Sequence, residues 1–296
     1  GGSYNEVEEA DGTHHRLEKG MKILGVLCRR KAVKGFVAEM PPKAAGGDKL
    51  HFIGGGGVIA RCTEYPEEIG EPYDVEFKGF VVRDGEKLNV KDFSLDWKER
   101  LEDSAPLVMV AGTRMDSGKT TLAANLVEEL TDRGYRVGAA KLTGFTRQRD
   151  RIKMKDYGAV ESMDFVDAGI ITTMIEPDKV IRGGHAVLDE LSSRDLDLII
   201  VELGGGLIDP NHVMEVLTAD DIVKHTSTTI LTAMDPVAAY GAVHLLEDYG
   251  IEPDVFSGPA TDTKGGKDEI HDHLDIPALN GRKDVDEIAD VVEENL

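Results

Sequence analysis

The sequence predicts an α/β protein in which a mostly parallel sheet flanked by helices is preceded by a small β-rich domain. Residues 21–98 contain short or alternating apolar runs, whereas from residue 107 continuous apolar runs alternate with helical stretches. The pattern changes in the charged, proline-containing stretch 99–106. We therefore expect a tag remnant or flexible lead at 1–20, a β-rich domain at 21–104 and an α/β domain at 105–296.

The strands of the β-rich domain are predicted from short runs of β-forming residues. These runs are residues 21–28, 33–40, 49–53, 58–62 and 73–82. Asp84-Gly85 follows the last of them and predicts a hairpin turn. The four consecutive glycines Gly54 to Gly57 lie between two runs, and either a ligand cradle or a plain connection accounts for them.

The strands of the α/β domain are predicted from apolar runs without alternation, which suit strands covered on both faces. The runs are residues 107–111, 136–141, 196–202, 228–234 and 253–257. A helix is expected after Gly118, because Leu122, Leu126 and Leu130 form one apolar stripe and Gly134 can end it.

Composition restricts the partners that the protein can bind. It carries 34 Lys and Arg against 56 Asp and Glu, a formal charge of −22. Such a surface repels phosphate backbones and anionic lipid, so neither nucleic acid nor membrane is an expected partner. Two unpaired cysteines and the lack of a signal sequence or of a membrane-spanning apolar run favour a cytoplasmic protein.

The most informative motif is LVMVAGTRMDSGKTT, residues 107–121. A buried strand runs into Gly112, five residues intervene, and Gly118 opens a helix. This is a phosphate-binding loop by mechanism: backbone amides and the helix amino end attract phosphate, Lys119 reaches the β and γ phosphates, and the Thr120 hydroxyl ligates Mg²⁺. The predicted nucleotide-binding residues are Gly112, Thr113, Arg114, Met115, Asp116, Ser117, Gly118, Lys119, Thr120 and Thr121.

The five-residue spacing resembles that of dethiobiotin synthetases and their relatives in the SIMIBI class of P-loop proteins. The resemblance also covers Lys141 in GAAKLTG and Glu202 in LIIVELGGG. It implies that Lys141 contacts substrate and γ phosphate, that Glu202 is the acid after the third strand, and that the protein is a homodimer. Where these synthetases commonly have Asp-Thr-Glu, this chain has Arg114-Met115-Asp116, so only Asp116 keeps an acidic role and another reaction is expected.

Elementary chemistry supports the same residues. Lys141 ends a parallel strand, at the edge where open sheets bind ligands, and would stabilise charge on a transferred phosphoryl group. Glu202 ends an apolar strand, so its carboxylate needs a metal or a lysine, and it would hold Mg²⁺ together with Thr120. We therefore predict Lys119, Lys141, Asp116 and Glu202 as catalytic residues and Thr120 and Glu202 as metal ligands.

A small anionic substrate is expected beside these residues, because five cations fall between residues 147 and 155 of an acidic protein. A solvated basic face explains them equally well. The predicted substrate-binding residues are Lys141, Thr143, Arg147, Arg149, Arg151, Gly204 and Gly205. Asp156, Glu161, Asp164 and Asp167 follow, and we interpret them as helix-surface acids. The alternative is that one of them, with Asp164 and Asp167 the best candidates, assists Mg²⁺ or accepts a proton.

These residues predict a Mg²⁺-ATP-dependent synthetase or kinase that activates a small carboxylate or phosphate substrate. ATP is favoured over GTP because no Asn-Lys-x-Asp motif is present to hold guanine. The alternative function is a nucleotide-dependent dimeric switch or accessory protein that controls a partner.

Overall fold

The computed structural model describes residues 4–33 and 35–296, which form two compact units. The described part of the first unit contains residues up to Ser94 together with 145–149, and the second contains residues 95–144 and 150–296. Residues 1–3, part of the segment expected to be a tag remnant or flexible lead, and Lys34, within the predicted strand 33–40, lie outside the described residues.

The first unit is β-rich, as predicted for residues 21–98. Its main sheet has the strand order β4-β5-β7-β6-β8, with antiparallel pairing along this path, and β3 pairs in parallel with β7. The bounds are β3 Val26–Leu27, β4 Arg30–Lys31, β5 Val37–Glu39, β6 Lys49–Gly54, β7 Val58–Glu64 and β8 Tyr73–Glu76. Strands β9 (Val82–Arg83) and β10 (Glu86–Lys87) form the hairpin predicted at Asp84-Gly85, and the short helix η1 (Val90–Phe93) follows.

A second hairpin lies within residues 1–20, where a flexible lead was expected. Strand β1 (Glu6–Glu8) pairs antiparallel with β2 (His14–Arg16). Val7 and Leu17 pack against a small core that contains Leu50 and Phe52. The polar composition of these strands concealed this hairpin, because Val7 is the one apolar residue within them.

The division between the units falls after Ser94 rather than at the expected residue 104. Leu95, Trp97 and Leu101 pack with the core of the second unit, and Trp97 Nε1 donates a hydrogen bond to the Ala168 carbonyl at 2.6 Å. The charged stretch 99–106 therefore belongs to the second unit.

The glycine run lies against the segment 145–149 of the same unit. A Cβ on Gly54 would lie 2.5 Å from the Phe145 ring, and one on Gly56 would lie 2.7 Å from the Thr146 carbonyl oxygen. Atoms cannot approach that closely without movement, so these two positions require glycine for close approach of backbone. The glycine run therefore packs against other residues of the protein, which favours a plain connection between strands over a ligand cradle.

Gly56→Ala should therefore destabilise the protein by about 1–3 kcal/mol, the usual range for overpacking. Denaturant unfolding of the full chain measures this loss. Gly55→Ala is the matched control, because its Cβ would lie 3.4 Å from the nearest atom, a nitrogen of Arg147. Equal stability of the two variants would contradict the close-approach explanation.

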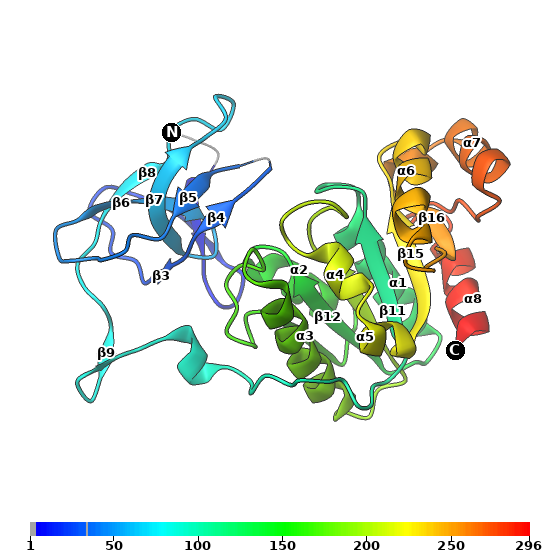
Figure 1. Cartoon of the computed structure of the whole chain (residues 1–296), viewed down its shortest axis with the longest axis horizontal. Helices are drawn as coiled ribbons and strands as arrows, with labels where there is room; N and C mark the ends of the chain where they lie inside the picture. Colours follow the sequence, from blue (N-terminus) through cyan, green and yellow to red (C-terminus); the bar gives the residue numbers. More distant parts are fainter. Residues whose placement is uncertain (1–3, 34) are drawn as a thin grey trace. The chain divides into compact units, whose positions relative to one another are not determined.

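The second unit is built on a six-stranded parallel sheet with the order β13-β12-β14-β11-β15-β16. Figure 1 labels four of these strands, β12, β11, β15 and β16. The bounds are β11 Leu107–Gly112, β12 Val137–Thr143, β13 Glu161–Asp164, β14 Leu198–Leu203, β15 Thr226–Thr232 and β16 Val255–Ser257. Five of the strands agree with the predicted runs. The interpretation of Glu161 and Asp164 as helix-surface acids was wrong, since both lie on the edge strand β13.

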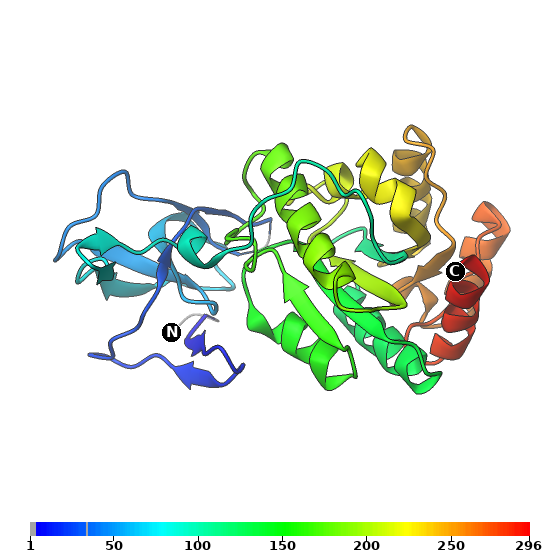
Figure 2. The same cartoon turned by 90° about the horizontal axis from the view of Figure 1, so that it is seen from below.

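Helices cover both faces of this sheet, as predicted (Figure 2). Their bounds are α1 Lys119–Asp132, α2 Gln148–Asp156, α3 Pro177–Ser192, α4 Val213–Leu217, α5 Asp220–His225, α6 Pro236–Glu247, η2 Pro259–Thr261, α7 Lys264–Leu274 and α8 Val285–Asn295. Val108 and Val110 pack with α1 and α8, whereas Met109 and Ala111 pack with α3 to α7 on the opposite face. Because successive residues of β11 are buried on opposite faces, the strand is apolar throughout.

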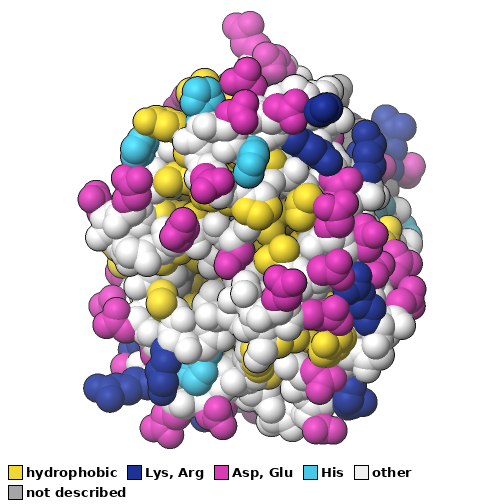
Figure 3. All heavy atoms as spheres, turned by 90° about the vertical axis from the view of Figure 1, so that its right-hand side faces the viewer, with side chains coloured by type: hydrophobic (Ala, Val, Ile, Leu, Met, Phe, Trp, Pro, Cys, Tyr) yellow, Lys and Arg dark blue, Asp and Glu magenta, His cyan; other side chains and the backbone are white. Residues whose placement is uncertain are grey.

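The surface agrees with the acidic composition. Asp and Glu side chains are spread over the face seen in Figure 3, where Lys and Arg are fewer. Among the described residues, no helix is both long and apolar enough to cross a membrane.

Candidate functional site

The predicted phosphate-binding loop joins β11 to α1. It begins at Gly112, the last residue of the buried strand, and it ends at Gly118, whose φ of 97° precedes the first turn of α1. The Ser117 and Thr232 hydroxyls are hydrogen-bonded at 2.6 Å, and the Thr113 N–H donates to the Thr232 carbonyl at 2.9 Å. These contacts fix both ends of the loop to the neighbouring strand β15.

The exposed side chains of the loop are at its tip. Arg114 and Asp116 are exposed, Met115 is half-buried, and Arg114 Nε donates to the Met115 carbonyl at 3.2 Å. Asp116 has a φ of 62°. Asp116 is exposed at the tip of the loop and is accessible to a ligand. Among the described residues, it forms no hydrogen bond or ion pair with Lys119 or Glu202.

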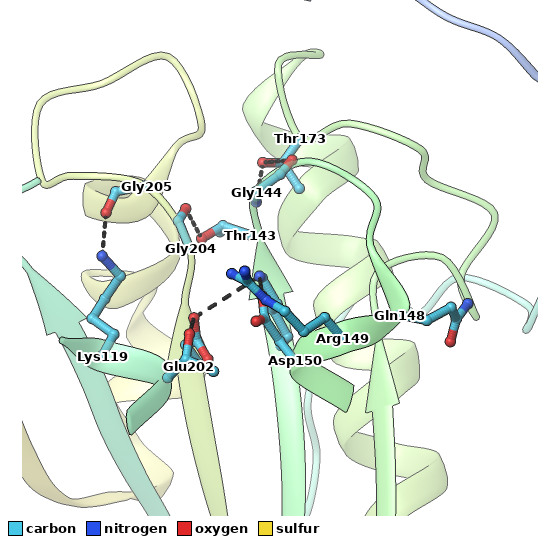
Figure 4. Close-up of polar contacts among 12 residues, drawn as sticks. Lys119, Thr143, Gly144, Gln148, Arg149, Asp150, Thr173, Glu202, Gly204 and Gly205 are labelled. Carbon is cyan, nitrogen blue, oxygen red and sulfur yellow. Dashed lines mark hydrogen bonds and ion pairs between the residues drawn. The ribbon is translucent and has the colours of Figure 1, made fainter. Parts of the chain in front are cut away.

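Lys119 is buried and lies between two carbonyl oxygens. Its Nζ donates to the Gly205 carbonyl at 2.7 Å (Figure 4). It also donates to the Arg114 carbonyl at 2.9 Å. Burial lowers the pKa of this amine, and the Glu202 carboxylate opposes the shift. Lys119 therefore links the loop between β11 and α1 to the glycine turn after β14.

The two predicted metal ligands lie together at the start of α1 and the end of β14. Thr120 Oγ1 donates to Glu202 Oε1 at 2.9 Å. Glu202 is 3 % exposed, and its Oε2 is buried without a hydrogen-bond partner. Burial raises the pKa of Glu202, although Lys141 opposes the shift. A buried carboxylate oxygen with no partner fits a cation ligand, and its desolvation otherwise costs about 1–3 kcal/mol.

A Mg²⁺ ion would have few protein ligands here. Among the described residues, no group of three or more His, Cys, Asp or Glu side chains could hold a metal ion. Thr120 and Glu202 alone suit a cation that is completed by phosphate oxygens and water, which is the usual mode for Mg²⁺ at nucleotides.

Lys141 lies beside Glu202 at the same edge of the sheet. Strands β12, β13 and β14 place Lys141 in register with Asp164 and with Glu202, and Lys141 Nζ is 3.9 Å from Glu202 Oε1. Its second partner is Asp150 of α2, with which it forms a buried ion pair. Burial opposes protonation of Lys141, but these two carboxylates offset it and raise its pKa.

Asp150 was missed by sequence reasoning. It is 5 % exposed, although it occurs within the basic run 147–155, where an acid is expected to be a solvated counter-charge. The only signal that could have found it is its position, a few residues after a strand that ends in a lysine.

The glycine turn after β14 packs tightly against the end of β12. A Cβ on Gly204 would lie 2.5 Å from the Thr143 carbonyl oxygen. The Thr143 hydroxyl donates to the Gly204 carbonyl at 2.9 Å, so its side chain is used within the protein. Figure 4 shows that the predicted residues Thr143, Gly204 and Gly205 lie together near Lys119. Lys141 is also close, since a Cβ on Gly204 would lie 2.9 Å from its Cε.

The predicted basic cluster is divided among several partners. Arg147 and Arg149 belong to the first unit. Arg151 pairs with both oxygens of Asp167 at 3.0 and 3.2 Å, and Lys155 lies 3.8 Å from Glu161. Arg151 and Lys155 thus pair with acids, and this agrees with the alternative explanation of these cations as a solvated basic face.

Asp164 is a buried carboxyl at the end of β13. Burial and the neighbouring Asp167 raise its pKa to about 6, while its Oδ1 accepts the Val166 N–H at 2.8 Å. The folded protein thus keeps this proton between about pH 4 and 6, where the unfolded chain has lost it. Since the unfolded state then binds fewer protons, stability falls as pH rises through this window.

Asp164→Asn should therefore stabilise the protein at pH 7–8 by up to about 3 kcal/mol, the equivalent of two pKa units. The amide keeps the acceptor for Val166 and carries no charge. Thermal unfolding at pH 4 and pH 8 measures this change, and the gain should be small at pH 4. A gain that does not depend on pH would contradict the assigned cause.

Comparison with known proteins gives only a distant likeness. No protein-family model and no curated protein sequence matches the chain. Similar solved structures include chloroplast FtsY from Physcomitrella patens (16% identity, 69% of this chain, 70% of that chain, TM-score 0.42). Others are cell division protein FtsY from Thermotoga maritima (20%, 69%, 74%, 0.42) and a DUF1611 family protein from Anabaena variabilis (14%, 68%, 62%, 0.49). The resemblance to dethiobiotin synthetases stays a prediction from the motifs.

Proposed function

We propose that the protein is a Mg²⁺-dependent enzyme that transfers the γ-phosphoryl group of ATP to a small anionic substrate. The main support is one group of side chains at the carboxyl edge of the sheet. Lys119, Thr120, Glu202 and Lys141 come from three different elements and meet beside the glycine turn. Two cations and a carboxylate with an unused oxygen suit a polyphosphate bound with its metal ion.

Each residue has a distinct task in this proposal. Amides of residues 113–118 bind the phosphates, and Lys119 leaves the Gly205 carbonyl to bind the β and γ phosphates. Lys141 stabilises charge on the transferred group as the bond to the leaving oxygen breaks and a bond to a substrate oxygen forms. Thr120 and Glu202 would hold Mg²⁺, which when bound neutralises charge on the phosphates.

A nucleotide-dependent switch is the second candidate, and one contact favours it. In the described structure Lys119 bonds to Gly205, so phosphate binding would release the glycine turn that follows β14. Such a release couples nucleotide binding to a change in loop structure. The motif resemblance implies a homodimer, and the partner in such a switch would then be a second copy of the chain.

Measurement of ADP release with a panel of carboxylate, amine and phosphate metabolites tests the proposal. A transfer enzyme should be stimulated at least tenfold by one class and should consume it stoichiometrically with ADP formation. Light scattering with and without nucleotide is run in parallel. Slow turnover with every metabolite, together with a nucleotide-dependent change in mass, would replace the proposal by the switch. The same panel with GTP tests the preference for ATP.

A further inference from the structure

The loop between β12 and α2 belongs to the first unit, although both neighbouring segments belong to the second. Residues 145–149 cluster with the amino-terminal residues, and the chain returns to the second unit at Asp150. The Phe145 ring contacts the buried Arg30 guanidinium at 4.3 Å, and Thr146 packs on Gly56. This loop is therefore held by residues of the first unit.

Glu8 of the hairpin β1-β2 binds the start of α2. Its side chain is 0% exposed, its Oε2 accepts the Gln148 N–H at 2.7 Å, and its Oε1 accepts the Arg149 N–H at 3.0 Å. The Glu8 N–H in turn donates to the Gly55 carbonyl at 2.8 Å. The hairpin and the glycine run thus fix the carboxylate that closes the first turn of this helix.

A carboxylate in this position has a clear physical reason. The first N–H groups of a helix have no partner within it, and the amino end carries positive potential. The residue before α2 is Arg147, whose side chain has no acceptor and so cannot cap the helix itself. A fully buried carboxylate is costly without such bonds, which makes its position strongly determined.

The next residue of the helix is Asp150, the buried partner of Lys141. A short side chain that leaves the first turn of a helix reaches its partner only when that turn is fixed. We infer that Glu8 is a positioning residue, because by binding the Gln148 and Arg149 N–H groups it determines where Asp150 meets Lys141. The cap on the first turn of α2 thereby sets the geometry of Lys141, the cation that the proposed function uses for phosphoryl transfer.

Glu8→Gln removes the charge and one acceptor while it keeps the shape. We expect faster hydrogen exchange of the α2 amides and faster acetylation of Lys141, both followed by mass spectrometry. Glu9→Gln is the matched control, since Glu9 is adjacent, exposed and paired with His15. It should leave both rates unchanged. Faster exchange in α2 with unchanged labelling of Lys141 would reduce Glu8 to a stabilising cap and overturn the inference.

The kinetic measurement rests on the proposed function. Glu8→Gln should lower kcat about tenfold with little change in nucleotide affinity, because a small displacement of a reacting group weakens catalysis more than binding. Glu8→Asp, which keeps the charge, should recover part of the loss. Equal effects on kcat and KM would contradict a positioning role.

Asp150→Asn supplies the second test. If Glu8 acts through Asp150, the double variant should lose no more activity than Asp150→Asn alone. Multiplied losses would mean independent roles and would overturn the inference. If the wild-type protein shows no nucleotide turnover, the proposed function fails, whereas the exchange and labelling rates still decide the role of Glu8. Circular dichroism confirms that each variant is folded.

Discussion

Lys119→Ala should weaken ATP binding about 100-fold and abolish turnover. A hydrogen bond from a charged donor contributes about 1.5–3 kcal/mol, and the upper value corresponds to about a factor of 100 in affinity. Lys119 is the amine best placed for the β and γ phosphates, because it is buried between the loop and the glycine turn. Isothermal titration with ATP and Mg²⁺ measures the affinity, and ADP release measures the turnover.

Lys224→Ala is the control for this variant, since Lys224 is exposed on α5. It removes the same charge from the protein without touching the loop, so its affinity should match that of the wild type. Lys119→Arg should bind nucleotide but turn it over slowly, because the larger group keeps the charge and loses the fit. Wild-type affinity in Lys119→Ala would refute the phosphate-binding role of the loop.

Glu202→Gln should lower turnover at least about 100-fold while leaving the fold as stable as before or more stable. The charge lost is the one that would hold Mg²⁺, and removal of a single charge-stabilising group typically has an effect of this size. The same charge is costly in the folded protein, because Oε2 has no partner. Single-turnover kinetics and denaturant unfolding measure the two effects separately.

The pH dependence of Glu202→Gln has a definite sign. Burial raises the pKa of Glu202, so the folded protein holds a proton that the unfolded chain has lost, and stability falls as pH rises above the unfolded value. Glu202→Gln has no carboxyl group at this position and so lacks this loss of stability. Its gain in stability over the wild type should therefore be larger at pH 7 than at pH 4. Glu128→Gln, an exposed change on α1, should show neither effect. Loss of both turnover and stability would instead indicate a structural ion pair.

Sequence reasoning found those parts of the site that follow apolar strands. Gly112, Lys141 and Glu202 each lie at or near the carboxyl end of a strand whose continuous apolar run could be read directly. Parallel strands bring such ends to one edge, so their proximity was predictable. The loop itself was predictable because its glycines, lysine and threonine are the residue types that phosphate binding requires.

Other elements were missed because their burial depends on tertiary packing. Strand β13 reads Glu-Ser-Met-Asp, and its polar residues Ser162 and Asp164 are buried in the folded protein. Asp150 and Glu8 are also charged residues with no local apolar pattern, and only their distant partners explain their burial. The glycine run was ambiguous for the same reason, since Phe145 and Thr146 lie far away in sequence.

The first unit is discontinuous in sequence, and this constrains the order in which the protein can assemble. During synthesis β11, α1 and β12 are made before residues 145–149, which the first unit requires for completion. A ribosome adds about 5–20 residues per second, and domains generally fold from the amino terminus. Here the first unit cannot be completed until residues 145–149, which follow β12 of the second unit, have been synthesised. A truncation at Ser94 would accordingly leave the glycine run facing water and α2 without its cap, so neither half can be expressed as an intact fragment by a single cut.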